Sequence, residues 1–303
     1  MSITAAMVAE LRNKTGAGMM DCKKALNEAG GNMEEAVDLL RKKGLSAAAK
    51  KSGRVAAEGL VVACGEGRRG ALVEVNAETD FVAKNEGFQQ FAAGICEVVL
   101  ENSPADLEAL KGLAYSGTGR NVEEELTHQI ATIGENMNIR RFERFEVVGG
   151  VVASYVHAGG KIGVLVELTT DKGDSEQVQT LARQLAMHVA AANPQFLKRE
   201  DVPAEILDRE KDIMTTKAKE SGKPENIIPK IVEGQLNKFF GEICLLEQAY
   251  VIDPDQKINQ VLKSVGKEAG GEIQLTGFVR YQLGEGLEKK ADDFASEVAA
   301  LTK

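Results

Sequence analysis

Residues 1–44 contain three short stretches in which apolar residues recur every three or four positions, the spacing of an amphipathic helix. A residue type that commonly caps helices stands before the first and third stretches, and glycine follows all three. These residues are Thr4 and Asn32 at the starts, and Gly16, the pair Gly30-Gly31 and Gly44 at the ends. The pattern predicts a miniature three-helix domain whose last helix ends before Gly44.

Three consecutive basic residues, Arg41-Lys42-Lys43, would then occupy the last turn of the third helix. Their charges would complement the partial negative charge of a helix C-terminus, which we favour over a binding patch. The following stretch, residues 46–54, is rich in Ala and Lys. We expect it to be a helical or mobile connector to a body that begins near Val55.

The body contains two similar stretches, residues 56–75 and 149–168, which align without a gap at an offset of 93 positions. In each, two apolar runs flank a glycine-rich turn, and a helix-like segment follows, over residues 88–100 and 178–192. We infer two related α+β subdomains, each with a small antiparallel sheet and helices on one face.

The glycines of the first turn, Gly65, Gly67 and Gly70, form a GxGxxG pattern like that of dinucleotide-binding loops. In those proteins the loop opens a helix whose N-terminus receives the pyrophosphate. Here residues 71–75 continue as an apolar strand, so we expect a hairpin turn and no nucleotide site. No GxxxxGK[ST] phosphate loop occurs in the chain either.

Two further helical stretches within residues 203–246 are separated by the helix-breaking sequence Ser221-Gly222-Lys223-Pro224. Polar residues lie between their apolar positions, which favours an antiparallel hairpin that projects as an arm, with its two helices packed mainly on each other. The tail predicts a helix near residues 257–265, a strand at 273–283 and a final helix at 292–301.

Composition narrows the classes of function. The 303 residues carry a net charge of −9, and only residues 1–55 are basic, at +4, which argues against a dedicated nucleic-acid binder. No apolar run approaches the ~18 residues that cross a bilayer, and the N-terminus lacks the layout of a signal peptide. We therefore expect a cytoplasmic protein without direct contact to nucleic acid or membrane.

Candidate catalytic chemistry is sparse. The four cysteines, Cys22, Cys64, Cys96 and Cys244, form no CxxC motif and no Cys/His pair at metal-ligand spacing, which predicts buried thiols, no metal site and no cofactor. No nucleophile elbow or HExxH helix occurs, so we expect no catalytic residue. We interpret His188, on an expected helix, as a structural histidine, whereas His157 stands at a hairpin turn where its ring can reach a partner.

The segment Thr79-Asp80-Phe81-Val82-Ala83 follows directly on the second apolar strand of the body. Phe81 and Val82 either turn inward over a helix that begins near Asn85, or protrude beside the carboxylate of Asp80. Because burial of a phenylalanine is worth about 2 kcal/mol, physical reasoning alone favours the inward orientation. Asp80 would then serve to cap the next turn.

Two long motifs reverse this preference. Residues 11–26, LRNKTGAGMMDCKKAL, and residues 74–84, EVNAETDFVAK, resemble the two signature stretches of the bacterial elongation factor Ts family. Further similar segments are Ile133-Gly134-Glu135-Asn136 with Ile139-Arg140-Arg141, and Met187-His188-Val189-Ala190-Ala191. The resemblance covers essentially the whole chain.

This resemblance implies an α+β fold with a head similar to ubiquitin-associated (UBA-like) domains, a duplicated core of antiparallel sheets and helices, a helical-hairpin or coiled-coil arm, and a C-terminal module. The implied boundaries are 1–54 for the three-helix head with its connector, 55–148 for the core N-subdomain, 149–202 for the first part of the core C-subdomain, 203–246 for the arm, and 247–303 for the rest of the core C-subdomain with the C-terminal module.

The resemblance also implies a function. Members of the family are non-enzymatic guanine nucleotide exchange factors for the GTPase elongation factor Tu, which they bind preferentially without nucleotide. They promote GDP release during translation elongation by disturbing the phosphate and Mg²⁺ site of the GTPase. The implied partner-binding residues are Thr79, Asp80, Phe81 and Val82 for dislocation of that Mg²⁺, Arg12, Met19 and Met20 in the head, and Ile133, Gly134 and His157 as further contacts.

Two other classes of function stay open at this point. A non-catalytic adaptor built on the helical arm would explain the head and the hairpin but not a protruding turn at Phe81. An enzyme that uses Asp80 or Glu78 as a base would need a pocket and a second reactive group, and the sequence supplies neither.

Overall fold

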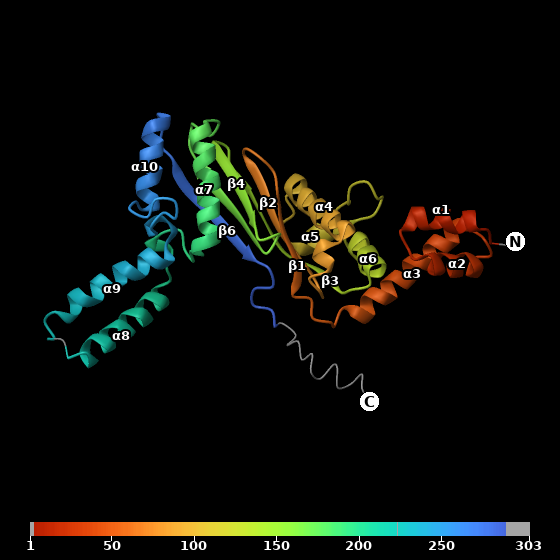
Figure 1. Cartoon of the computed structure of the whole chain (residues 1–303), viewed down its shortest axis with the longest axis horizontal. Coiled ribbons are helices and arrows are strands. Elements are labelled where there is room, and N and C mark those ends of the chain that lie inside the picture. The colour runs from red at the N-terminus through yellow and green to blue at the C-terminus, as the bar shows by residue number, and fades with distance from the viewer. Residues whose placement is uncertain (1–2, 223, 289–303) are drawn as a thin grey trace.

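A computed structural model describes residues 3–222 and 224–288 of the chain. The molecule is elongated, with three helices at one end, two projecting helices at the other, and two small sheets between them (Figure 1). Each sheet has three antiparallel strands, so the expected α+β class is confirmed. None of the helices in the described ranges is long and apolar enough to cross a membrane.

The three N-terminal helices, which we call the head, are α1 (Ala5–Thr15), α2 (Met19–Glu28) and α3 (Met33–Lys51). Their starts and turns follow the predicted capping chemistry. The Thr4 side chain accepts from the Met7 N–H, the Asn32 side chain accepts from two N–H groups of α3, and Gly16 closes α1 in the left-handed region. A small apolar core holds the head together, with Leu11, Cys22, Ala25 and Leu26 fully buried.

The predicted end of the third helix at Gly44 is wrong, because α3 continues to Lys51. Gly44 is buried where α3 crosses α6 (Val122–Ile133), and a Cβ there would lie 3.5 Å from the Ala131 Cβ. Gly44 is therefore a contact position between two helices and does not end one. The Arg41 guanidinium pairs with Glu124 of α6 and so does not serve a helix C-terminus.

The first sheet-and-helix unit follows the head. Its sheet has the strand order β1 (Glu58–Cys64), β2 (Arg69–Ala77), β3 (Met137–Glu146). A 3₁₀ turn (Val82–Lys84) leads into the long helix α4 (Glu86–Asn102), which packs on β1 and β2, and α5 (Leu107–Gly112) and α6 complete that side. Phe88, Phe91 and Ile95 of α4 are buried against the sheet and form the centre of its core.

The second unit repeats this plan. Its sheet has the order β4 (Gly150–His157), β5 (Ile162–Thr169), β6 (Gln274–Gln282), and its long helix is α7 (Glu176–Ala192). Helix α10 (Ile258–Ala269) packs beside α7. The tail elements α10 and β6 confirm the predicted helix and strand, whereas the final helix predicted at 292–301 lies outside the described residues.

The two units correspond residue by residue. The β-bulge of β2 between Glu74 and Val75 recurs in β5 between Glu167 and Leu168, at the predicted offset of 93. In the first strands, however, the ladders place Gly59 opposite Asn76 and Gly150 opposite Thr169, an offset of 91. The gap-free alignment was therefore two residues out in that strand. Since side chains alternate with period two, the error did not change which face is buried.

The inner faces of the two sheets pack on each other, and the long helices cover the outer faces (Figure 1). Val61 and Leu72 of the first sheet meet Val152 and Leu165 of the second. Gly70, the last glycine of the GxGxxG pattern, lies at this contact, where a Cβ would come within 2.8 Å of Val152. The pattern thus belongs to a hairpin turn and to sheet packing, as expected.

Between α7 and β6 the chain forms the predicted helical hairpin, which we call the arm. Its helices are α8 (Ala204–Glu220) and α9 (Ile228–Ile243), which pack on each other, and short 3₁₀ turns at Arg199–Asp201 and Leu245–Glu247 flank them. The arm projects from the second unit at the end opposite the head (Figure 1).

Candidate functional site

The segment between β2 and α4 separates its two adjacent apolar side chains. Val82 is 5% exposed and packs in the core of the first unit, whereas Phe81 is 75% exposed. The inward orientation that physical reasoning favoured is therefore wrong for Phe81 and right for Val82. Val82 anchors the turn and offers no surface to a partner.

The Phe81 ring stands among charged groups. Asp80 is exposed beside it, and the Lys84 ammonium lies 5.8 Å from the ring centroid. The next residue along, Asn85, caps α4 by accepting from the Phe88 N–H at 3.1 Å. Asp80 thus does not cap this helix, and its carboxylate is available beside an exposed aromatic ring.

Two carboxylates brace this turn against the segment that follows α6. Glu135 accepts from the Thr79 N–H at 2.9 Å and from the Thr79 Oγ1 at 2.7 Å. In the opposite direction, Glu78 accepts from the Asn136 N–H at 2.5 Å. The predicted residues Ile133 and Gly134 therefore lie next to the Phe81 turn: Gly134 ends α6 with φ +90°, and Ile133 packs on the core of the first unit.

His157 ends β4 and is exposed at the β4–β5 turn, as expected. Its Nδ1 lies 2.9 Å from the Tyr155 hydroxyl. The same turn contacts β1 through a hydrogen bond of 2.7 Å from the Val61 N–H to the Gly160 carbonyl. Leu60, next to Val61, pairs with Val75 close to the end of β2. The His157 turn therefore lies at the same edge of the sheets as the 78–82 turn, which follows β2.

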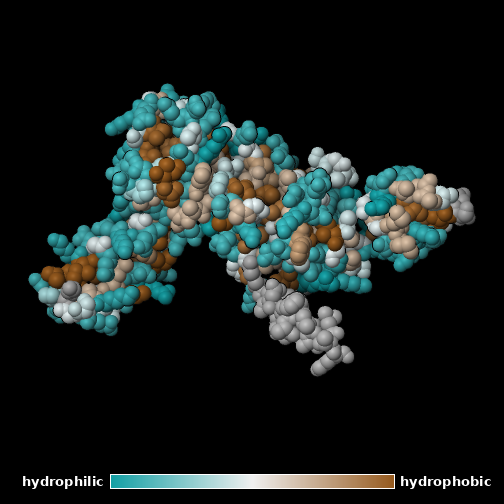
Figure 2. All heavy atoms as spheres, viewed as in Figure 1, coloured by the Kyte–Doolittle hydropathy of each residue, from teal (hydrophilic) through white to brown (hydrophobic). Residues whose placement is uncertain are grey.

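The head residues form a separate surface. Met19 and Met20 are 59% and 63% exposed, and with Arg12 they line a groove of about 740 Å³ between α1 and the start of α2. Apolar residues are visible on the head in Figure 2, which shows one face of the molecule. The head lies at the far end of the first unit (Figure 1), so the predicted residues form two separate surfaces.

Sequence reasoning missed a buried ion network behind the first surface. Glu74 is fully buried in β2 and accepts from Arg141 at 2.6 Å, from Arg140 at 3.0 Å and from the Gly284 N–H at 2.8 Å. Burial alone would raise the pKa of Glu74, but these bonds and one from Asn76 hold it below its ordinary value. A glutamate within the apolar run of residues 70–75 was the available signal.

The network attaches the residues that follow β6 to the first unit. Arg140 donates to the Glu285 carbonyl, and the Arg141 guanidinium lies 4.1 Å from the Tyr281 ring centroid. Gly284 has φ +69°, and a Cβ there would stand 2.4 Å from the Ala57 carbonyl oxygen, so only glycine fits this crossing. The last described residues are thereby held beside β2.

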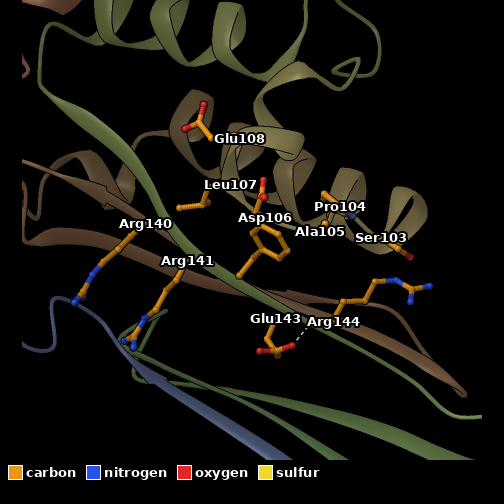
Figure 3. Close-up of a pocket in the computed structure, with 11 residues that line it drawn as sticks. Ser103, Pro104, Ala105, Asp106, Leu107, Glu108, Arg140, Arg141, Glu143 and Arg144 are labelled. Carbon is orange, nitrogen blue, oxygen red and sulfur yellow. Dashed lines mark hydrogen bonds between the residues drawn. The ribbon is translucent and has the colours of Figure 1, made fainter.

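The charged side chains around the cavity drawn in Figure 3 all contact other groups of the chain. The cavity has a volume of about 720 Å³ between residues 103–108 and β3. Each of its six charged side chains is engaged within the chain: Arg140 and Arg141 by Glu74, Arg144 by Glu146, Glu143 by the Arg144 N–H, Asp106 as the cap of α5, and Glu108 by Lys111.

Two cysteines and one histidine elsewhere in the chain have shifted pKa values. Burial raises the pKa of the Cys244 thiol to about 11, and the neighbouring Cys64 together with burial raises that of Cys96. His188 is buried, its Nε2 lies 2.9 Å from the Gln248 Oε1, and its Nδ1 accepts from the Val251 N–H at 3.3 Å, so it is the structural histidine that was predicted. In the part of the chain that the structure describes, no three His, Cys, Asp or Glu side chains lie close enough to hold a metal ion.

Comparison with known proteins identifies relatives of the whole chain. Residues 78–285 match the family model described as Elongation factor TS. A protein named Elongation factor Ts from Syntrophotalea carbinolica is 67% identical over 303 residues, which cover 100% of both chains. Proteins of the same name from Magnetococcus marinus and Trichlorobacter lovleyi are each 56% identical, the first over 100% of both chains, the second over 99% of this chain and 98% of its own.

Proposed function

The chain thus belongs to the elongation factor Ts family, a family of translation factors, and from this premise we propose that it is a guanine nucleotide exchange factor for the GTPase elongation factor Tu. The factor acts in the cytoplasm during translation elongation and prefers the nucleotide-free GTPase. It makes and breaks no covalent bond itself and contacts neither nucleic acid nor membrane. The acidic net charge of −9 supports the absence of nucleic-acid contact.

The observation that carries this proposal is the exposed Phe81. An aromatic ring left 75% in water at a braced turn forfeits burial worth about 2 kcal/mol, which a partner's pocket can recover. Inserted near the Mg²⁺ of the GTPase, the ring would displace the groups that hold the ion. Asp80 beside it adds a carboxylate, the ligand type that Mg²⁺ prefers and that phosphate repels.

The other predicted partner-binding residues have different roles. The UBA-like head grips the nucleotide-binding domain of the GTPase through Arg12, Met19 and Met20, and the exposed methionines suit an adaptable apolar contact. Gly134 and His157 extend the surface around the 78–82 turn. Thr79, whose side chain binds Glu135, and the buried Val82 act within the turn and not as contacts.

Such a factor obeys linkage. If its binding weakens GDP by some factor, GDP must weaken its binding by the same factor. Excess GDP therefore displaces the exchange factor, and excess factor displaces GDP. No phosphate-binding loop of its own is needed, which agrees with the hairpin conformation of the GxGxxG glycines.

The test is the release of a fluorescent GDP analogue from purified elongation factor Tu. Substoichiometric amounts of the chain should accelerate release at least tenfold, and the acceleration should decline as free GDP is raised. Calorimetry of the isolated chain with GDP should show no binding in the micromolar range. Binding to the GTPase without any change in release would support the adaptor alternative, and micromolar GDP binding to the chain alone would revive the enzyme alternative.

A further inference from the structure

The turn that carries Phe81 is fixed by two reciprocal hydrogen-bonded contacts to one distant segment. Glu135 receives both the backbone N–H and the hydroxyl of Thr79, and Glu78 receives the backbone N–H of Asn136. The arrangement is reciprocal, because Glu78 precedes Thr79 and Glu135 precedes Asn136 in the sequence. The two segments are 56 to 58 residues apart in sequence, so this brace forms only in the folded unit.

The connector from the head joins the same brace. The Asn136 side-chain N–H₂ group donates to the Arg54 carbonyl at 2.7 Å, and the Arg54 guanidinium lies 3.3 Å from Glu78. Arg54 stands three residues after the end of α3, which packs on α6. Three segments therefore contact one another at the brace: the Phe81 turn, the residues after Gly134 and the connector from the head.

The brace has a direction. The N–H and hydroxyl of Thr79 are both engaged on the Glu135 side, and Val82 is buried in the core, so the two residues between them have no freedom to turn inward. Phe81 is held outward by these two anchors. A flexible turn would spend part of its time with the ring folded onto the surface, and binding would then have to order it.

The equivalent turn of the second unit lacks this construction. There the contacts are made by the backbone: the Thr170 N–H donates at 3.2 Å to the carbonyl of Gly149, just before β4, and the Ser175 N–H donates at 2.9 Å to the Lys172 carbonyl within the turn. No carboxylate from a distant segment is seen to hold residues 170–175 in the described contacts. The brace is therefore not a requirement of the shared fold.

We infer that Glu135, assisted by Glu78, is a positioning residue for nucleotide exchange: its carboxylate presets the Phe81 turn in the orientation that displaces nucleotide from the GTPase. This inference rests on the proposed exchange function and adds to it a residue that touches neither nucleotide nor Mg²⁺. Arg54 and Asn136 connect the head to the preset turn, so that gripping by the head places the ring.

The decisive variants are Glu135→Ala and Glu135→Gln in the full-length chain, with Glu66→Ala at the exposed tip of the β1–β2 hairpin as control. Glutamine can accept from the Thr79 N–H and donate to its hydroxyl, whereas alanine can do neither. At saturating factor, Glu135→Ala should lower the maximal rate of GDP release about tenfold, since small misplacements of an acting group have effects of this order. Glu135→Gln should stay within about threefold of the wild type, and the control should be unchanged.

A role through Phe81 requires a specific pattern in the kinetics. The concentration of factor for half-maximal release should change less than about threefold for Glu135→Ala, because the head contacts are intact. In a Phe81→Ala background, Glu135→Ala should produce no further loss, since the ring it positions is gone. Should Glu135→Ala fold poorly, Thr79→Val, which removes one hydroxyl donor, should lower the maximal rate by about threefold while the melting temperature falls by only about 2–4 °C.

Several outcomes would overturn the inference. These are a wild-type rate for Glu135→Ala, losses that multiply in the double variant, or a loss in Glu135→Gln as large as in Glu135→Ala. A wild-type chain that fails to accelerate GDP release at all would instead refute the proposed function itself. The wild-type chain thus tests the proposed function, and the Glu135 variants test the inference, within one experiment.

Discussion

In both sheet-and-helix units, an arginine of the third strand donates through its Nε to a carbonyl near the end of the long helix. Arg144 reaches the Leu100 carbonyl at 2.8 Å, and Arg280 reaches the Ala190 carbonyl at 3.3 Å. The buried residues of α4 recur in α7 at a constant offset of 90 positions, from Phe88 and Val178 onward. The two units therefore share their burial pattern and at least one equivalent side-chain hydrogen bond.

They differ where the second strand leaves the sheet. Eight residues join β2 to α4, and they carry the exposed Phe81, whereas five polar residues and one glycine join β5 to α7. They also differ beneath the bulge. Glu74 is buried between two arginines, but the equivalent Glu167 accepts a single hydroxyl, that of Thr276, at 2.7 Å.

This difference shows how one repeated scaffold can carry two tasks. The shared hydrogen bonds and apolar positions maintain the sheet and its helix in both units. The first unit adds a braced, protruding turn and the ion network that binds Gly284 and Glu285, and the second adds the arm between its helix and its last strand. The exchange function proposed above places the functional difference in these connections, which can be tested by comparing corresponding positions of the two units.

The largest expected effect is on stability at the paired glutamates. Glu74→Ala leaves two partly buried arginines without their carboxylate and should lower the free energy of unfolding by about 3 kcal/mol. Glu167→Ala removes one hydroxyl contact at the half-exposed equivalent and should cost about 1 kcal/mol. Urea denaturation of both variants measures the comparison, and equal losses would mean that the ion network is no stronger than a single hydroxyl bond.

The second effect concerns exchange. Phe81→Ala should slow GDP release by about thirtyfold, which corresponds to the ~2 kcal/mol of an aromatic anchor, while the melting temperature stays near that of the wild type because the ring is exposed. Asp174→Ala, which lies in the shorter second turn at the strand offset of 93, should leave the rate unchanged. A large fall in melting temperature for Phe81→Ala would show that the ring packs inward in solution.

The features that could be predicted from the sequence are those that depend on contacts between residues close together in the chain. The four hairpin strands, β6, the hairpin turns and the caps at Thr4 and Asn32 follow local patterns, and they were predicted correctly, whereas the strand β3 was not predicted. The end of α3 was not, because Gly44 has the same local signature whether it ends a helix or packs against another one. The residue that decides, Ala131 of α6, is distant in sequence.

The candidate site divides in the same way. An exposed ring at Phe81 could be expected only by resemblance, since a strand-to-helix bend gives no sign of which of two adjacent apolar residues turns inward. The brace from Glu135 and the burial of Glu74 were not predicted at all. Both depend on β3 and the segment before it pairing with β2, and no local pattern encodes which carboxylate then meets which donor.

A third and smaller effect tests which unit holds the head. Gly44 is helical and has ordinary contact distance to Ala131, so Gly44→Ala should raise the free energy of unfolding by about 0.5–1 kcal/mol through helix propensity. Gly44→Leu should reverse the sign, because its larger side chain would separate α3 from α6. Hydrogen exchange should then report loosened amides in α6 of the first unit and not in α7. Destabilisation by alanine would mean that a Cβ at residue 44 lies closer to the Ala131 Cβ than 3.5 Å.

The smallest effect distinguishes the long helices by their response to pH. His188 of α7 occupies the position of Val98 in α4, and burial lowers its pKa below the ordinary 6.5, although the bond to Gln248 acts in the opposite direction. As the pH falls through 6.5, the unfolded chain takes up a proton at this histidine while the folded chain does not. The stability contributed by the neutral ring is therefore complete above pH 6.5. It declines as the pH falls from 6.5 toward the lower folded-state pKa. His128 in the first unit has a pKa lowered by burial as well and adds a decline of the same sign, so the informative quantity is a difference. Urea denaturation at a series of pH values should give a smaller pH slope for His188→Gln than for the wild type, and identical slopes would show that the ring titrates as freely in the folded protein as in the unfolded chain.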